Sequence, residues 1–489
     1  MRARKLFTLE NVSQILGSEI FLRNSSDEHL PGNFRVDSRQ VTPGDGFIAI
    51  RGTREDGHAY IKDAVRAGAA CVILETGYFE KHREELIRLG ASLIPVENPV
   101  RGAAMLARAW LDEVSPKAIG ITGSVGKTTT REFLHRALKY NFKTHAAVKS
   151  YNTLIGTSLT ILSMPSDTGI LIVELGTNHP GEIREMVQNF PISHAIITEI
   201  SDAHLEGLGS IEGVLAAKME ITESDSLEYL SYNSDNDLLS TAIARMPDGE
   251  KLKKNGIKQI GVGYSNTGIR ISDVRQIMNN LFEPSLLVTL SIGEKKLECR
   301  APLFGKQHAR NIGFAYAASS QMGLDDEVFA EAVKTFRLPA GRGVIRRGRN
   351  ECVLIDETYN ASPSSISSAI KNLLEMEIPG DFKRVAILGG MKELGLESNH
   401  FHEVILNRVA LLDDVYLIGR EWSEVSRKPE VVRGVWDSTE KFASDFELHE
   451  SSKSAVLVKG SRFYELEHLM KRMEYIENAP AEDCGDGKC

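Results

Sequence analysis

The sequence predicts an α/β protein of three domains. Its 489 residues are too many for one hydrophobic core, because single domains typically hold about 100–200 residues. Continuous apolar runs such as GILIVELG and HAIITEI alternate with helical patterns, as expected of parallel strands covered on both faces. A further apolar run, KAIGIT at 117–122, leads through a glycine-containing turn into a helical pattern, which is typical of phosphate-binding sheets.

The predicted elements follow one another in a regular order. Residues 34 to 97 alternate short apolar strands with helical patterns, as in a small α/β domain. A helical segment then ends before Pro116, and the glycine-containing segment from Leu338 to Gly343 is a second boundary. The predicted domains are a small α/β domain, residues 1–113, a central phosphate-loop domain with a mostly parallel sheet, 114–337, a Rossmann-like domain, 338–478, and a flexible tail, 479–489.

The composition agrees with a large soluble enzyme, and we expect a cytoplasmic location. A net charge of -9 argues against nucleic acid or an anionic membrane as the main partner. No apolar run approaches the about 20 residues that span a bilayer, and the first residues lack the apolar core of a signal peptide. Five cysteines are scattered along the chain, and the pair Cys484 and Cys489 lies in a polar tail without a second pair for zinc.

The turn after the apolar run at 117–122 predicts a binding site for the phosphate chain of a nucleotide. Backbone N–H groups of the turn and of the helix N-terminus can face one anion, Lys127 can reach the β- and γ-phosphates, and the Thr128 hydroxyl can bind magnesium. Ile121 stands where the general phosphate-loop pattern has glycine, but the order of strand, turn and helix supports the prediction. The predicted contacts are Gly123, Ser124, Val125, Gly126, Lys127, Thr128 and Thr129.

Polar residues also stand at the ends of several other predicted strands. Glu174 and His204 follow strands of the central domain, and Asp356 and Lys459 end strands of the third. Such residues are often helix N-caps, and this reading stays open for each one. Ligands of parallel sheets bind outside the carboxyl ends of the strands. The shared position of these polar residues at strand ends therefore predicts a cleft for a nucleotide and a second substrate.

The motifs, taken together, resemble those of the Mur ligase family. VDSRQVTPGDGFIAI, TGSVGKTTT, YNTLIG, ELGTNHPGEI, AHLEGLGS, AAKMEI, DETYNASP, GGMKELG and VKGSR occur in family order over nearly the whole chain. Several are most similar to the branch that adds D-alanyl-D-alanine to UDP-N-acetylmuramoyl-tripeptide in peptidoglycan synthesis. The resemblance implies a UDP-sugar-binding first domain, an ATP-binding central domain and a third domain for the dipeptide.

The resemblance also implies an ATP-driven amide ligation through an acyl phosphate. Lys127, Lys218, His204 and Arg342 would be catalytic. Thr128 and Glu174 would hold a first magnesium ion, and Glu174, His204 and Lys218 a second. Because an ammonium cannot bind a cation, Lys218 would act as a carbamate, which offers oxygen ligands to this hard ion.

The remaining site residues are likewise implied by the resemblance. Asn311, Arg342 and Asp356 would bind ATP. Arg342 would contact the γ-phosphate, and Asp356 would contact the ribose. The residues expected to contact the other substrates are Ser38, Arg39, Asn152, Asn178, His179, Tyr359 and Asn360. Three residues depart from the family pattern, His308, Ser362 and Gly390, and the sequence leaves the effect of each departure open.

Two other functions remain open at this point. One is a related ligase that adds another amino acid or acts on a carboxylate such as a folate, although the DSRQVTPGDGF segment favours a UDP-sugar. The other is a nucleotide-binding paralogue without ligase activity, against which the set of Lys127, Glu174, His204 and Lys218 argues. We expect a monomer, and the third residue of the acceptor peptide is not determined by the sequence.

Overall fold

The computed structural model divides the chain into two compact units. Unit 1 comprises Met1–Ile200, Leu215–Val262 and Phe314–Phe329, and unit 2 comprises Ser201–Val214, Gly263–Gly313 and Ala330–Cys489. The structure describes residues 7–21, 32–52, 55–147, 150–246, 256–265, 268–349, 352–446 and 453–474. The predicted flexible tail, with Cys484 and Cys489, lies outside the described residues.

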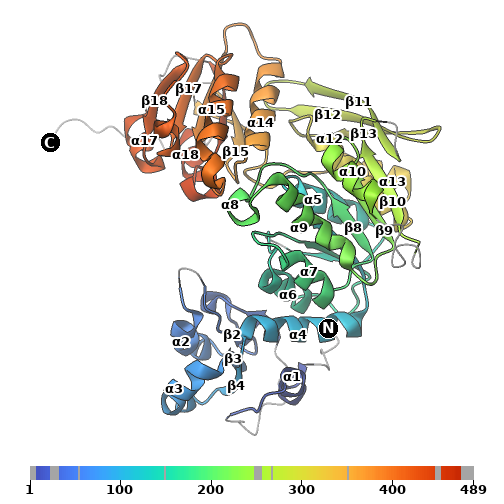
Figure 1. Cartoon of the computed structure of the whole chain (residues 1–489), viewed down its shortest axis with the longest axis vertical. Helices are drawn as coiled ribbons and strands as arrows, with labels where there is room; N and C mark the ends of the chain where they lie inside the picture. The colour runs from blue at the N-terminus through green and yellow to red at the C-terminus, as the bar shows by residue number, and fades with distance from the viewer. Residues whose placement is uncertain are drawn as a thin grey trace, which may run out of the picture. The chain divides into compact units, whose positions relative to one another are not determined.

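The N-terminal part of unit 1, drawn in blue in Figure 1, contains a parallel sheet of four strands in the order β1-β2-β3-β4. Helices α2 and α3 share one hydrophobic core with this sheet, because their apolar residues recur at helical spacing. The elements are α1 (Leu9–Leu16), β1 (Phe34–Arg35), β2 (Gly46–Ile48), α2 (Ile61–Arg66), β3 (Cys71–Glu75), α3 (Thr76–Ile87), β4 (Ser92–Val96) and α4 (Pro99–Val114).

Unit 1 also contributes six parallel strands in the order β10-β9-β8-β5-β7-β6. They are β5 (Lys117–Thr122), β6 (Thr144–Ala146), β7 (Ile170–Glu174), β8 (His194–Ile197), β9 (Tyr229–Asn233) and β10 (Lys258–Gly263). The helices that alternate with them are α5 (Lys127–Leu138), α6 (Leu154–Leu162), α7 (Glu182–Asn189), α9 (Ile211–Met219) and α10 (Asp237–Arg245). Because β5 lies between β7 and β8, the carboxyl ends of these three strands meet.

Unit 2 contains an antiparallel ribbon of β11 (Ile269–Met278), β12 (Pro284–Ile292) and β13 (Lys295–Ala301). Buried and exposed residues alternate along β13, as expected of a strand with one solvated face. The short helix α8 (Leu205–Leu208) also belongs to this unit, whereas α12 (His308–Gln321) and α13 (Asp326–Lys334) each have residues in both units.

The rest of unit 2 is a six-stranded sheet in the order β14-β15-β19-β16-β17-β18, in which only β14 is antiparallel to its neighbour. Its strands are β14 (Val344–Arg347), β15 (Val353–Glu357), β16 (Lys383–Gly389), β17 (Asp414–Ile418), β18 (Val432–Trp436) and β19 (Ser454–Lys459). Its helices are α14 (Pro363–Glu375), α15 (Ser398–Val409), α16 (Glu421–Glu424), α17 (Thr439–Asp445) and α18 (Glu467–Met473).

The predicted α/β fold with mostly parallel sheets is confirmed. Two separate hydrophobic cores contain the apolar side chains of alternate residues of β15, β16 and β19, so that both faces of this sheet are buried. Among the described residues, no helix is long and apolar enough to cross a membrane.

Candidate active site

The phosphate loop connects β5 with α5. Gly123 has a φ of 138° and Gly126 one of 91°, which side chains rarely permit. The Thr198 hydroxyl, just after β8, donates to the Val125 carbonyl at 2.6 Å, and the Ser124 N–H donates to the Glu199 carbonyl at 2.8 Å. Since no side chain caps α5, its first N–H groups can receive an anion.

Two oxygen donors of the predicted magnesium site lie together beside this loop. The Thr128 hydroxyl donates to Oε2 of Glu174 at 3.0 Å. The contact follows from the sheet, because Glu174 ends β7 opposite Ile121 of β5. Glu174 is only 1% exposed. A buried carboxylate and a hydroxyl are ligands that suit Mg²⁺, so these two residues fit the first predicted ion.

Lys218 is fully buried in α9, and its Nζ has no hydrogen-bond partner within the part of the chain that the structure describes. Burial, and then the nearby charge of Lys127, holds the pKa of the Lys218 amine well below its ordinary value of 10.5, although Glu182 and Glu220 act in the opposite direction. A neutral amine is the form that reacts with carbon dioxide. The lowered pKa increases the fraction of Lys218 in this neutral form.

His204 belongs to unit 2, where it precedes α8 in a left-handed backbone conformation, with φ of 57°. Its Nδ1 lies 2.5 Å from the carboxylate of Glu393, which also has a positive φ, 64°. The Glu206 N–H donates to the Glu393 carbonyl at 3.2 Å. The other predicted magnesium ligands, Thr128, Glu174 and Lys218, belong to unit 1. Within unit 2, the carboxylate that contacts His204 is that of Glu393.

The predicted substrate residues after β7 are held by the partly buried carboxylate of Glu182. Glu182 accepts hydrogen bonds from the N–H groups of Asn178 and His179, at 2.7 and 3.2 Å, and from the Thr177 hydroxyl at 3.0 Å. Asn152 lies close by, because its carbonyl accepts from the Gly176 N–H at 2.7 Å. Asn152, Asn178 and His179 are thus positioned at the carboxyl end of β7.

The linker around Arg342 is tied to the end of β15. The Arg342 guanidinium carbon lies 3.9 Å from the centroid of the Tyr359 ring, which is a close cation–π contact. The carboxylate of Asp356, 3% exposed, accepts from the Gly341 N–H at 3.1 Å, and the Gly343 N–H donates to the Asp356 carbonyl at 2.7 Å. Arg342 and Tyr359, predicted separately, are therefore brought together.

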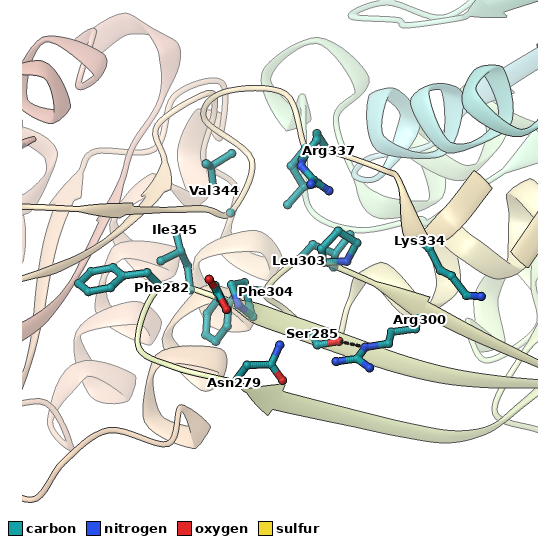
Figure 2. Close-up of a pocket in the computed structure, with 15 residues that line it drawn as sticks. Asn279, Phe282, Ser285, Arg300, Leu303, Phe304, Lys334, Arg337, Val344 and Ile345 are labelled. Atoms are coloured by element: carbon teal, nitrogen blue, oxygen red, sulfur yellow. Dashed lines mark hydrogen bonds between the residues drawn. The ribbon is translucent and has the colours of Figure 1, made fainter. Parts of the chain in front are cut away.

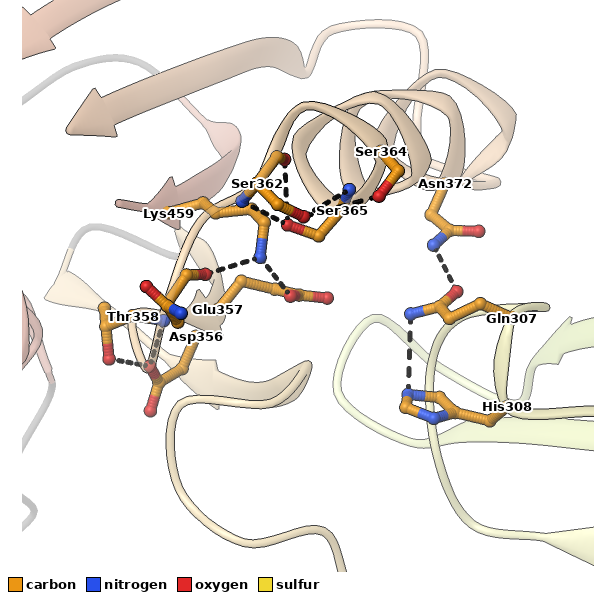
Figure 3. A network of polar contacts seen from close by, with 11 residues as sticks. Gln307, His308, Asp356, Glu357, Thr358, Ser362, Ser364, Ser365, Asn372 and Lys459 are labelled. Atoms are coloured by element: carbon orange, nitrogen blue, oxygen red, sulfur yellow. Dashed lines mark hydrogen bonds and ion pairs between the residues drawn. The ribbon is translucent and has the colours of Figure 1, made fainter. Parts of the chain in front are cut away.

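His308 and Asn311, predicted near the nucleotide base, lie side by side at the start of α12. The Asn311 amide nitrogen is 3.3 Å from Nδ1 of His308. Burial lowers the pKa of His308 to about 4, so the imidazole is neutral near pH 7. Figure 3 shows that Gln307 extends the network, since its side-chain carbonyl accepts a hydrogen bond from the side-chain amide of Asn372 in α14 at 2.6 Å.

Lys459 and the residues of the third domain around it occupy the ends of β15 and β19. The Lys459 ammonium donates to Glu357 at 2.9 Å and to the carbonyl of Asn360 at 3.0 Å (Figure 3). Ser362 caps α14 in a reciprocal capping box with Ser365, which gives this departure from the family pattern a structural role.

The other departure in the third domain, Gly390, has a packing cause. A Cβ at Gly390 would lie 2.7 Å from Oε2 of Glu421 and 3.0 Å from the Tyr464 hydroxyl. Glu421 itself accepts from Tyr464 and contacts the Lys392 ammonium. An aspartate at 390 would therefore meet a carboxylate that already fills this position.

Ser38 and Arg39 lie in a short 3₁₀ turn of the first domain, Ser38–Gln40. The Arg39 guanidinium donates to Asp37 at 2.8 and 2.9 Å, which holds the pKa of the Asp37 carboxyl at about 2. The Arg39 side chain is 86% exposed. It is thus charged, oriented and accessible to a ligand.

A cavity of 620 Å³ lies in unit 2 beside the linker. Figure 2 shows apolar side chains, including Phe282 and Ile345, toward one side of it and the basic Arg300 and Lys334 toward the other. None of the residues that line it belongs to the predicted site. Nor do the described residues hold a group of three His, Cys, Asp or Glu side chains with metal-binding geometry.

Comparison with known proteins places the chain in a family. Three family models match in succession: "Mur ligase family, catalytic domain" at 33–111, "Mur ligase middle domain" at 121–319 and "Mur ligase, glutamate ligase domain" at 341–462. UDP-N-acetylmuramoyl-tripeptide--D-alanyl-D-alanine ligase of Rickettsia prowazekii is 30% identical, over 89% of this chain and 94% of that protein. The chain belongs to the Mur ligase family. The predicted family is thereby confirmed.

Other Mur ligases extend the comparison. The enzyme of the same name from Escherichia coli is 27% identical over 96% of this chain and 98% of its own. The crystal structure of MurF ligase from Thermotoga maritima in complex with ADP has a TM-score of 0.76 at 27% identity, covering 90% of this chain and 96% of that one. A MurF structure from Acinetobacter baumannii, 22% identical, has the same fold, with a TM-score of 0.79 over 95% and 98% of the chains. The three-domain architecture is therefore confirmed.

Sequence reasoning missed two charged residues beside the predicted Mur ligase site. Arg131 lies one helical turn after Thr128, and its Nη1 is 2.9 Å from Oε1 of Glu174. Its spacing of three residues from Thr128 could have revealed it, because such residues share a helix face. Glu393 lies within the motif GGMKELG, but no spacing indicated its contact with His204, since the two residues are far apart in the sequence.

Proposed function

We propose that this Mur ligase joins D-alanyl-D-alanine to UDP-N-acetylmuramoyl-tripeptide with ATP, releasing ADP and phosphate. The observation that carries the proposal is the match, at 30% identity, over 94% of the length of a relative named for this reaction. The ADP complex of the similar Thermotoga maritima MurF ligase supports the nucleotide. The product would be the pentapeptide precursor of peptidoglycan.

The reaction requires two successive displacements. The tripeptide carboxylate attacks the γ-phosphorus and the bond from that phosphorus to the β–γ bridging oxygen breaks, which gives an acyl phosphate and ADP. The dipeptide amine then attacks the acyl carbon, loses a proton and expels phosphate. Such transfers depend mainly on positioning and on neutralising charge. We assign these tasks to the N–H groups of the phosphate loop, to Lys127 and to Arg342.

Magnesium would be held by residues of the candidate site described above. Thr128 and Glu174 would bind a first ion, and Glu174, His204 and a carbamate on Lys218 a second. When bound, these ions would neutralise the charge that gathers on the phosphates and the substrate carboxylate. The buried, unpartnered amine of Lys218 and its lowered pKa support the carbamate.

The remaining assignments follow the family pattern and the positions of the residues. Asn311 would contact the base and Asp356 the ribose. The residues proposed for the UDP-sugar peptide and the dipeptide are Ser38, Arg39, Asn152, Asn178, His179, Tyr359 and Asn360. The domain boundaries at 113 and 337, a monomeric state and a cytoplasmic location remain predictions, and the family models at 33–111, 121–319 and 341–462 support the boundaries.

The proposal is tested with purified protein, ATP, UDP-N-acetylmuramoyl-tripeptide and a panel of amines, scored by phosphate release and product mass. We expect both readouts with D-alanyl-D-alanine and neither with single amino acids. Ligation of another amine instead would favour the related-ligase alternative, which the names of the relatives do not support. Nucleotide binding without any product would favour the paralogue that has lost ligation.

A further inference from the structure

The two oxygens of Glu174 have different partners. Oε2 faces the Thr128 hydroxyl at 3.0 Å, and Oε1 lies 2.9 Å from Nη1 of Arg131. The side chains of Arg131 and Glu174 are only 2% and 1% exposed, so water screens this ion pair poorly. The other guanidinium nitrogen, Nη2, contacts Glu132, whose side chain is 30% exposed.

This arrangement controls the charge that a cation meets beside the loop. One buried carboxylate is balanced by one buried guanidinium, and the Lys127 side chain, bonded to the Gly123 carbonyl, adds a second positive charge nearby. A divalent cation near Oε2 would be attracted by Glu174 and repelled by both cations. The phosphates of a nucleotide would supply the negative charge that these donors lack.

We infer that Arg131 is a positioning residue that neutralises Glu174 and holds its Oε1, so that a divalent cation enters the phosphate loop only together with the nucleotide. The inference rests on the proposed function, because it assigns Glu174 to the cation. It goes further in stating an order: the loop of the free enzyme does not store the ion.

The test separates the charge of Arg131 from the polar character of its side chain. Arg131→Gln removes the charge but keeps an N–H donor, and Arg131→Lys keeps the charge. Binding of Mn²⁺ is measured by equilibrium dialysis as the excess of Mn²⁺ in the chamber that holds the protein, with and without ATP, because ATP alone also binds Mn²⁺ in solution. Arg136→Gln is the matched control, because Arg136 lies on the same helix and its guanidinium carbon is 6.0 Å from the centroid of the Tyr140 ring.

We expect the wild type, Arg131→Lys and Arg136→Gln to take up Mn²⁺ only with ATP. Arg131→Gln should bind Mn²⁺ without nucleotide at least about tenfold more tightly than the wild type, since a nearby positive charge is lost. Adding Glu174→Gln should abolish this gain. The melting temperature of Arg131→Gln should also rise with Mn²⁺ alone, which provides a readout even if the variant is unstable.

The outcomes distinguish this inference from the proposed function. Equal Mn²⁺ affinity of Arg131→Gln and the wild type without ATP would overturn the inference and leave the ligase proposal intact. Binding of Mn²⁺ at Glu174 of the wild type without nucleotide would also overturn the inference and leave the ligase proposal intact. If ATP brings no Mn²⁺ to the wild type, both the inference and the assigned magnesium site are wrong.

Discussion

Replacing Lys218 by methionine should stabilise the fold and abolish ligation. The side chain is fully buried and its Nζ has no partner among the described residues. A buried polar group without a hydrogen bond costs about 1–3 kcal/mol, and methionine of similar length removes that cost. If Lys218 is needed for the reaction, stability and activity must change in opposite directions.

Lys459 provides a matched control. It is also buried, 3% exposed, but its ammonium pairs with Glu357 at 2.9 Å and donates to the Asn360 carbonyl at 3.0 Å. Lys459→Met would leave the Glu357 carboxylate without its partner, which costs about 3–5 kcal/mol for buried pairs. The same substitution should thus stabilise the protein at position 218 and destabilise it at position 459.

The pH dependence of stability is an independent test of the destabilising effect of the buried Lys218 amine. The pKa of Lys218 in the folded state lies well below its ordinary value of 10.5, mainly because of burial. The unfolded chain therefore binds a proton that the folded chain has released, and wild-type stability rises with pH up to about 10.5. Lys218→Met lacks this contribution, so its advantage in stability over the wild type should shrink as the pH rises toward about 10.5.

The assay is thermal unfolding of the whole protein, because Lys218 lies in unit 1 and Lys459 in unit 2. The buffers are free of carbon dioxide, since a carbamate would give Lys218 new partners. For a domain of about 150–250 residues, each kcal/mol of unfolding free energy changes the melting temperature by about 2–4 °C. Bicarbonate, Mg²⁺ and ATP, added together, should then stabilise the wild type more than they stabilise Lys218→Met. A lower melting temperature for Lys218→Met near pH 7, or normal ligation by this variant, would refute the reasoning.

Three further predictions concern the phosphate loop and its surroundings. Lys127→Ala should lower turnover in the phosphate-release assay by about 10² or more, the scale of losing one electrostatic stabiliser, and near-normal release by the folded variant would contradict the role. Lys218→Ala should be inactive but partly rescued by acetate, whose oxygens can replace a carbamate; activity without acetate would exclude the carbamate. Gly123→Ala should weaken nucleotide binding at least about tenfold in a titration, because its Cβ would lie 2.1 Å from Thr198 Oγ1 in a backbone with φ of 138°. Gly181→Ala, also at positive φ but with no atom within 4 Å, is the control and should bind normally.

Local patterns in the amino-acid sequence determine much of this protein by themselves. The phosphate loop could be predicted because its strand, turn and helix are consecutive, and because the glycines permit a backbone that side chains rarely adopt. Glu174 could be predicted because a carboxylate at the end of an apolar strand lies at the edge where parallel sheets bind ligands. The family could be identified because its motifs keep their order along the chain.

Contacts between distant segments were decided only by the tertiary structure. Glu393 lies far from His204 in the sequence, and no helical or strand period relates the two residues. Glu421 lies 31 residues after Gly390 but fills the space beside it, because β16 and β17 are neighbours in the sheet. The ion pair of Arg131 with Glu174 likewise depends on the order of strands, which places β7 next to β5. Sequence periodicity specifies which face of an element is buried, whereas the choice of its neighbours depends on the packing of the whole sheet.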